Sequence, residues 1–178
     1  MAILELPEKS EWTAEVLETL SPEFRYEVRE GNLVVMAAAM RPWHADAQYR
    51  IVRVLREQGR HAYIEQGVEI GPGEIRTCDV GVFREPPAGD AAYRPATDFA
   101  LLVEIVSNSS HREDRGIKPR LYASAGIPEY WRVEEAPDGT AMVHRYLLTH
   151  AVDGSPVYVE TEVSSLDELE AGQGQQKL

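Results

Sequence analysis

Lysine and cysteine are both scarce in this chain of 178 residues, which holds 15 Arg but only 3 Lys and a single cysteine, Cys78. One cysteine excludes an intrachain disulfide, and the sequence contains no Cys/His spacing typical of a metal site. No apolar run approaches the roughly 18 residues that a transmembrane helix needs, and the first residues lack the basic and apolar regions of a secretory signal. We therefore expect a cytoplasmic protein without a membrane-spanning segment.

A basic excess is also absent, because the formal net charge is −12. The acidic excess lies in the two ends: residues 1–40 hold 8 acids and 3 bases, and residues 121–178 hold 10 acids and 3 bases. The centre, residues 41–120, holds 12 of each. Binding along a duplex depends on lysine and arginine contacts to phosphates. This distribution therefore argues against a protein that wraps a double helix and is compatible with a small or locally bound phosphate substrate.

The apolar patterns predict a single α/β domain over residues 1–170 and a disordered polar tail over 171–178. Ser10 is the expected N-cap of a first short helix, and Pro42 is expected to open a long helix that ends near Gln58. The other expected elements are a hairpin over 24–36, strands over 61–70, 77–83, 100–107, 129–135, 140–148 and 155–163, and a helix over about 113–124. A long loop over 84–98 connects two of these strands and is expected to lie near a functional site.

Two carboxylates stand inside the apolar strand patterns, and an interior lysine follows them. Asp79 lies in CDVGVF, Glu104 lies in LLVEIVS, and Lys118 is the one lysine away from the chain ends. A carboxylate in a buried strand is costly unless it binds a cation or an ion-pair partner. Mg²⁺ takes one or two carboxylates and completes its shell with water and phosphate oxygens. The three residues therefore indicate a metal-dependent hydrolase of phosphodiesters, in which the lysine assists the attacking water.

Structural roles remain open for each of these residues. Asp79 can cap a turn or pair with an arginine such as Arg76, and Glu104 can belong to a buried ion pair. Asp114 and Tyr122 share a helical face with Lys118 if the helix is continuous, and packing or support is the simpler role for both.

Further candidates are less specific. His44 stands in the first turn of the long helix, where it can act on a phosphate or be an ordinary surface or capping histidine. Glu27 lies in the predicted hairpin, where a solvated strand face is the simpler interpretation. Cys78 directly precedes Asp79 and is better explained as a core residue than as a nucleophile.

From about Tyr26 to Tyr146 the chain resembles the Uma-two family of restriction endonuclease-like proteins in the PD-(D/E)XK nuclease superfamily. The resemblance is carried by YEVREGNLVVM, by CDVGVF and above all by LLVEIVSNSSHREDRGIKPRLYASAGIPEYWRV. It implies an α/β (α+β) restriction-endonuclease-like core, with a mixed central sheet flanked by helices. It also implies a nucleic acid substrate, DNA or RNA, with Mg²⁺ or Mn²⁺ as cofactor and a homodimer as the assembly.

By the same resemblance, Asp79 and Glu104 are metal ligands, Lys118 takes the catalytic lysine role, and His44 and Glu27 are further site residues. Pro119 and the nearby Gly116 depart from a regular helix, so the helix is expected to begin near Lys118. The competing function is a non-catalytic homodimeric domain that retains the nuclease fold. If Lys118 is catalytic, its removal is expected to abolish activity with little change in stability.

Overall fold

The computed structural model describes residues 11–36, 40–107 and 110–175. Its helices are α1 (Ala14–Leu17), α2 (Pro42–Glu57), α3 (Lys118–Ser124) and α4 (Leu166–Gln175), with a 3₁₀ turn at Ala96–Asp98 and a π-helical turn at Glu113–Ile117. The strands are β1 (Arg25–Arg29), β2 (Asn32–Met36), β3 (His61–Gly71), β4 (Glu74–Phe83), β5 (Tyr93–Pro95), β6 (Phe99–Ile105), β7 (Glu129–Glu135), β8 (Ala141–His150) and β9 (Pro156–Ser165). No helix in this described part is long and apolar enough to cross a membrane.

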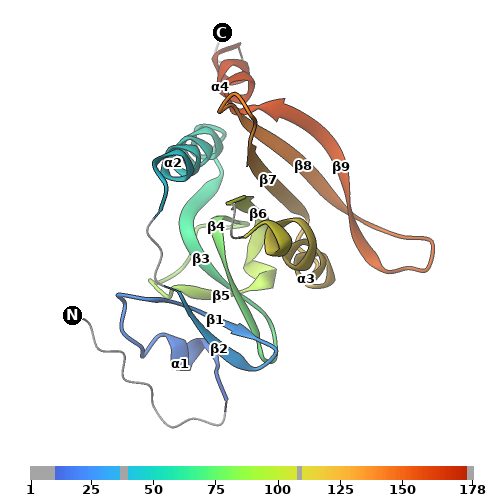
Figure 1. The fold of residues 1–178 in the computed structure, drawn as a ribbon. Coiled ribbons are helices and arrows are strands. Elements are labelled where there is room, and N and C mark those ends of the chain that lie inside the picture. Colours follow the sequence, from blue (N-terminus) through green and yellow to red (C-terminus); the bar gives the residue numbers. More distant parts are fainter. Residues whose placement is uncertain (1–10, 37–39, 108–109, 176–178) are drawn as a thin grey trace.

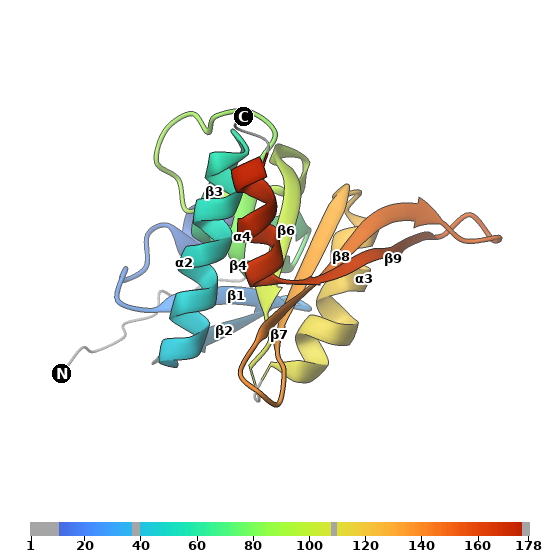
Figure 2. The same ribbon diagram turned by 90° about the horizontal axis from the view of Figure 1, so that it is seen from above.

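One mixed sheet joins the strands in the order β2-β1-β4-β6-β7-β8-β9, and β3 adds to β4 and carries β5 on its other side. The β6–β7 and β3–β5 pairs are parallel, whereas the remaining pairs are antiparallel. Helices α2 and α4 lie together on one side, α3 lies on the other, and the β8–β9 hairpin projects from the body (Figures 1 and 2). The expected mixed sheet flanked by helices is therefore confirmed.

The central strand β6 is covered on both faces, as its unbroken apolar sequence predicts. Leu101 and Val103 pack into the cluster that includes the α2 residues Ile51 and Val54. Leu102 points to the opposite cluster, which includes Tyr122 of α3. Because side chains alternate along a strand, Glu104 falls on the α3 side with Leu102. The period of the strand thus sets which face carries the carboxylate.

The regular part of the last central helix begins at Lys118, as the positions of Gly116 and Pro119 predict. Residues Glu113–Ile117 form a π turn, and Pro119 falls in the first turn of α3. A proline there lacks only a hydrogen bond that the first turn cannot make, so it costs little. The break places Lys118 at the junction of the two turns.

The predicted disordered tail over 171–178 needs a correction, because α4 continues to Gln175; residues 176–178 lie outside the described part. Ser165 and Glu168 form a reciprocal capping box, with Glu168 N–H donating to Ser165 Oγ and Ser165 N–H donating to Glu168 Oε2. Arg50 of α2 binds Glu170, at 2.8 Å, and Leu166 is fully buried. A polar composition therefore did not exclude a helix that is capped and docked on α2.

No residue of the loop over 84–98 lines the cavity that holds the candidate site, contrary to expectation, although Ala92 and Tyr93 line a neighbouring cavity. Strands β4 and β6 are antiparallel and pair Phe83 with Phe99 at the end where the loop leaves and returns. Asp79 and Glu104 lie toward the other end of this pair, and the loop forms β5 and the 3₁₀ turn instead. The N-terminal helix also differs in its start: Thr13 is its N-cap, and Ser10 lies outside the described residues.

Candidate active site

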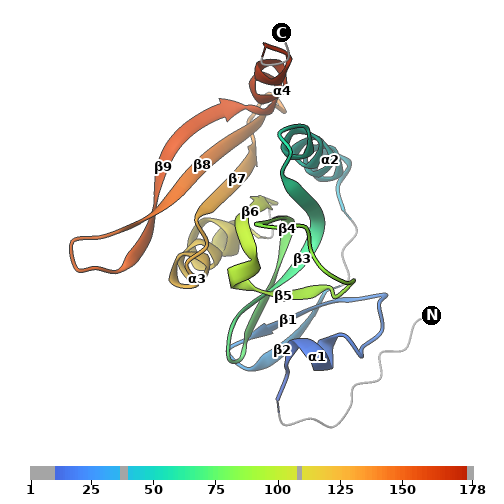
Figure 3. The same ribbon diagram turned by 180° about the vertical axis from the view of Figure 1, so that it is seen from behind.

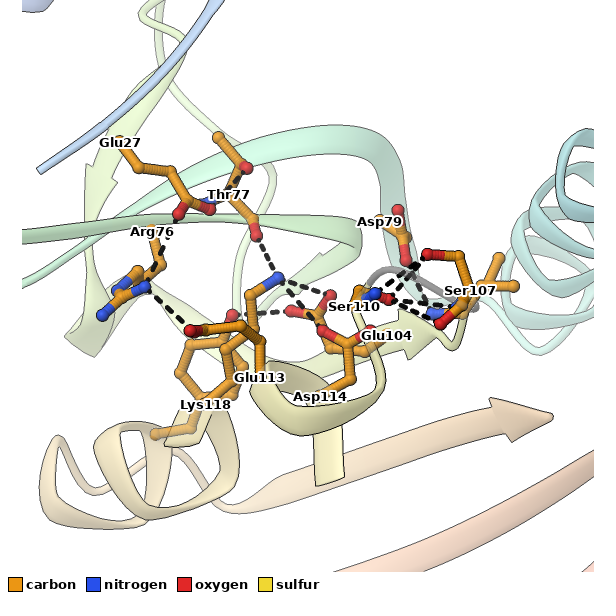
Figure 4. A network of polar contacts seen from close by, with 12 residues as sticks. Glu27, Arg76, Thr77, Asp79, Glu104, Ser107, Ser110, Glu113, Asp114 and Lys118 are labelled. Carbon is orange, nitrogen blue, oxygen red and sulfur yellow. Dashed lines mark hydrogen bonds and ion pairs between the residues drawn. The ribbon is translucent and has the colours of Figure 1, made fainter. Parts of the chain in front are cut away.

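The five candidate side chains come from five elements and line one cavity of about 280 Å³. They are Glu27 of β1, His44 of α2, Asp79 of β4, Glu104 of β6 and Lys118 of α3. The residues span 92 positions of sequence between Glu27 and Lys118, so only the folded sheet can bring them together. Most of this cluster is drawn in Figure 4.

Glu104 and Lys118 form the buried centre of the cavity. The Lys118 ammonium donates to Glu104 Oε2 at 2.8 Å and to the Thr77 carbonyl at 2.9 Å. Tyr122 donates its hydroxyl to Glu104 Oε1 at 2.6 Å. Glu104 and Lys118 are 1% and 8% exposed. Lys118 therefore reaches the site, and the buried ion pair considered from sequence exists between the two candidate residues themselves.

The charges in this centre act on each other strongly. Burial raises the pKa of Glu104 well above its ordinary value, the Lys118 ammonium opposes this rise, and the Asp114 and Asp79 carboxylates add to it. Burial alone lowers the pKa of Lys118, but the surrounding carboxylates, Glu104 and Asp114 first, outweigh it and raise that pKa. The ammonium is thus kept charged in a place that water hardly reaches.

Asp79 occupies the more open side of the cavity. Its Oδ2 accepts a hydrogen bond of 2.6 Å from the backbone N–H of Ile105, next to Glu104. Its Oδ1 lies 3.3 Å from His44 Nε2. Burial lowers the pKa of His44, but the Asp79 carboxylate outweighs this and raises it. The alternative partner, Arg76, binds Glu74 and Glu113 instead.

Glu27 is buried rather than solvated, which removes the simpler interpretation of this residue. It is 1% exposed, and its Oε1 accepts hydrogen bonds from Thr77 N–H and Thr77 Oγ1, both at 2.9 Å. Burial raises its pKa, but Lys118, Thr77 and Arg29 together outweigh this and lower it. Since the Thr77 carbonyl accepts a hydrogen bond from Lys118, Glu27 anchors the residue that positions the lysine.

Further polar residues lie in or beside the cavity, and the sequence indicated their position weakly or not at all. Asp114 is 1% exposed and its Oδ1 lies 3.5 Å from Lys118 Nζ, as their spacing of four allowed. Glu65 has a positive φ of 55°, which is uncommon for a residue other than glycine. Gln48 donates to Glu65 at 2.9 Å and to the Asp79 carbonyl at 2.8 Å. No sequence signal singled out Glu65 or Gln48.

The oxygen donors in the cavity suit a hard cation such as Mg²⁺. In the described residues there is no group of three or more His, Cys, Asp or Glu side chains arranged as a complete metal cage. Mg²⁺ does not require one, since one or two carboxylates with water and phosphate are its usual partners. Asp79 and Glu104 can supply these two carboxylates. The buried Asp114 Oδ1, which lies 3.5 Å from Lys118 Nζ, is a further carboxylate oxygen nearby.

Two comparisons with known proteins found a match, one to a family and one to a solved fold. A family model described as "Uma2: Putative restriction endonuclease" matches residues 13–175. A solved structure described as a putative nuclease belonging to DUF820, from Anabaena variabilis, is similar with a TM-score of 0.60. The similarity covers 91% of this chain and 99% of that chain at 15% sequence identity, so it shows the fold alone. No curated protein matches.

Proposed function

The chain belongs to the Uma2 family, and from that premise we propose that it is a metal-dependent endonuclease that hydrolyses phosphodiester bonds of nucleic acid. The observation that carries the proposal is the position of Lys118, whose buried ammonium contacts Glu104 in the cavity that also holds Asp79. A cation, two carboxylates and an accessible cavity are the elements that hydrolysis of a phosphodiester needs.

The charge of the cavity supports a requirement for metal. Three basic residues line it, Arg25, Arg29 and Lys118, against six acidic ones, Glu27, Glu65, Asp79, Glu104, Glu113 and Asp114. Such a lining repels a phosphate group unless a cation is added. When bound by Asp79 and Glu104, Mg²⁺ or Mn²⁺ would neutralise phosphate charge and make a water more acidic.

The protein groups have distinct parts in the proposed reaction. Lys118 stabilises negative charge that grows on the phosphate and orients the water. Tyr122 and Lys118 each hold one oxygen of Glu104, which fixes the plane of the carboxylate. Asp79 is fixed by the Ile105 N–H. In the proposed reaction His44, whose Nε2 lies 3.3 Å from Asp79 Oδ1, donates a proton to a substrate oxygen.

The proposed activity is tested with single-stranded and duplex DNA and RNA in Mg²⁺, in Mn²⁺ and in EDTA. We expect cleavage only with metal, and a loss of at least ~100-fold in Asp79→Asn, since the metal contributes several kcal/mol to such reactions. Asp46→Asn is the matched control, because Asp46 is an exposed acid on α2 and is not part of the cavity. Absence of cleavage of every substrate would favour the non-catalytic domain.

We also propose that the protein is a homodimer in solution, and the β8–β9 hairpin supports this assembly. Leu147, Val152, Val159 and Val163 are exposed on it, and in Figure 3 the hairpin extends away from the rest of the fold. Light scattering is expected to give twice the monomer mass. Val159→Glu should weaken the dimer, whereas Ile64→Glu, at an exposed apolar residue of β3, should not. A monomeric wild type would refute the proposal.

A further inference from the structure

A second cavity adjoins the candidate active site and shares a wall with it. It measures about 230 Å³ and lies between α1, β1, β3 and the segment that leads into β5. Arg25, Glu65 and Thr77 line both cavities. The end of the molecule that holds α1, β1 and β5 is seen in Figures 1 and 3. The two cavities are therefore neighbours, and the Arg25–Glu65 ion pair belongs to their common wall.

The two cavities differ in chemistry. Away from the shared wall, the second cavity is lined largely by apolar and aromatic residues: Leu17, Leu20, Pro22, Phe24, Tyr26 and Tyr93. Besides the shared Glu65, this cavity has one acidic residue, Glu18. The Glu18 Oε1 already accepts hydrogen bonds from the backbone N–H groups of Ala92 and Tyr93, at 2.6 and 3.0 Å. An aromatic cavity thus stands beside a strongly acidic one.

The backbone is shaped to form this wall. A side chain at Gly67 would begin 2.3 Å from the Tyr93 ring, so glycine lets that ring pack directly on β3. Tyr93 donates its hydroxyl to the Tyr26 carbonyl at 3.2 Å, which fixes the ring. Glu65 keeps its left-handed backbone between the two cavities, bound to Arg25 at 2.7 Å. Unusual backbone conformations of this kind concentrate at functional sites.

We propose that the second cavity binds the base of one unpaired nucleotide whose phosphate lies at Asp79 and Glu104. The inference rests on the proposed nuclease function and adds to it a base subsite and a preference for single-stranded substrate. A base offers a flat apolar face to aromatic residues such as Phe24 and Tyr93. Its polar edge can meet the shared wall, where Arg25 has donors beyond the one that binds Glu65.

Size and charge limit the choice of ligand. The cavity is smaller than the ~300–1,000 Å³ of pockets for drug-sized ligands, so it suits one heterocycle rather than a dinucleotide. A base in a duplex is paired and stacked, and it must be extruded before it can enter such a space. The acidic lining of the neighbouring cavity also offers few contacts to a second strand. Single-stranded nucleic acid therefore fits the pair of cavities.

The test uses the wild-type protein and single-stranded oligonucleotides in Mn²⁺. After the cut is mapped, each nucleotide that flanks it is replaced in turn by an abasic one. At one position we expect a loss of ~10-fold or more in kcat/KM, the scale of a lost base–aromatic contact. A duplex of the same sequence should be cut more slowly. Equal rates for every abasic oligonucleotide would overturn the base subsite even though the nuclease is active.

Two variants and a binding measurement separate the possible failures. Phe24→Ala should lower cleavage of the intact strand to the abasic rate and leave the abasic rate unchanged. Tyr49→Ala, at an exposed tyrosine outside both cavities, should behave as wild type. Saturation-transfer NMR with nucleoside 5′-monophosphates in Mg²⁺, which carry no phosphodiester to cut, should show base protons contacting wild type but not Phe24→Ala. Binding without cleavage supports the base subsite and refutes the nuclease, whereas absence of both refutes both.

Discussion

Replacing Glu104 by glutamine is expected to reduce metal-dependent cleavage at least ~100-fold while the protein stays folded. Glutamine keeps the size of the side chain and one acceptor, so the hydrogen bond from Tyr122 or that from Lys118 can persist. The lost charge removes a metal ligand, and several kcal/mol of transition-state stabilisation are lost with the metal. Removal of the carboxylate also relieves its repulsion with Asp79 and Asp114.

The measurement combines cleavage with thermal unfolding in the presence and absence of Mn²⁺. Wild type should gain thermal stability from the metal, because a ligand that binds only the folded state stabilises it, and Glu104→Gln should gain much less. The matched control is Glu113→Gln, since Glu113 lines the same cavity but pairs with Arg29 and Arg76 at its edge. If Glu104→Gln and Glu113→Gln lost equal activity, the loss would come from the reduced negative charge of the cavity, and Glu104 would not be a metal ligand.

The centre of this site could be predicted from the sequence because charged residues stand there in segments that are expected to be buried. Glu104 stands in an apolar strand, and Lys118 is the only interior lysine of an arginine-rich chain, so both were visible without a structure. Gly116 and Pro119 located the start of α3, which proved to be at Lys118. Residues that depart in this way from the pattern of their local sequence can be recognised without a structure.

The surroundings of the site could not be predicted because they depend on contacts between distant segments. From the residues alone a solvated strand face was the simpler interpretation of Glu27, and only the family resemblance made it a site residue. Nothing near it in the sequence shows that Thr77, 50 positions later, donates to it. The left-handed backbone of Glu65 has no local signal either, because glycine or asparagine would be expected there. The capping box of α4, formed by Ser165 and Glu168, could have been recognised in the sequence, but the polar composition of the segment favoured a prediction of disorder.

Replacing Lys118 by methionine is expected to abolish cleavage and also to destabilise the protein, in contrast to the small change in stability expected from the sequence. Methionine fills a similar volume but cannot donate to Glu104 or to the Thr77 carbonyl. Breaking a buried ion pair by removing one partner costs about 3–5 kcal/mol. Arg120→Met is the matched control, because it removes an exposed cation from the same helix.

The cost of this substitution should depend on pH when it is measured in EDTA. Burial holds the pKa of Glu104 above its ordinary value of 4.5, and loss of Lys118 removes the group that opposes this rise. Above pH 4.5 the folded variant therefore keeps a proton that the unfolded chain releases, so its stability falls as the pH rises. Chemical denaturation at several pH values should show a gap between wild type and Lys118→Met that widens with pH.

The activity of the variants decides whether the lysine acts in the reaction or only neutralises Glu104. If it acts, Lys118→Met should lose at least ~100-fold in cleavage even where Glu104 is protonated or metal-bound, because a charged donor at the phosphate contributes a few kcal/mol. Lys118→Arg should not restore it, since the planar guanidinium is wider than the ammonium that fits 2.8 Å from Glu104 and 2.9 Å from Thr77. Full cleavage by Lys118→Met in saturating Mn²⁺ would instead assign the chemistry to the metal and leave the lysine a structural counter-ion.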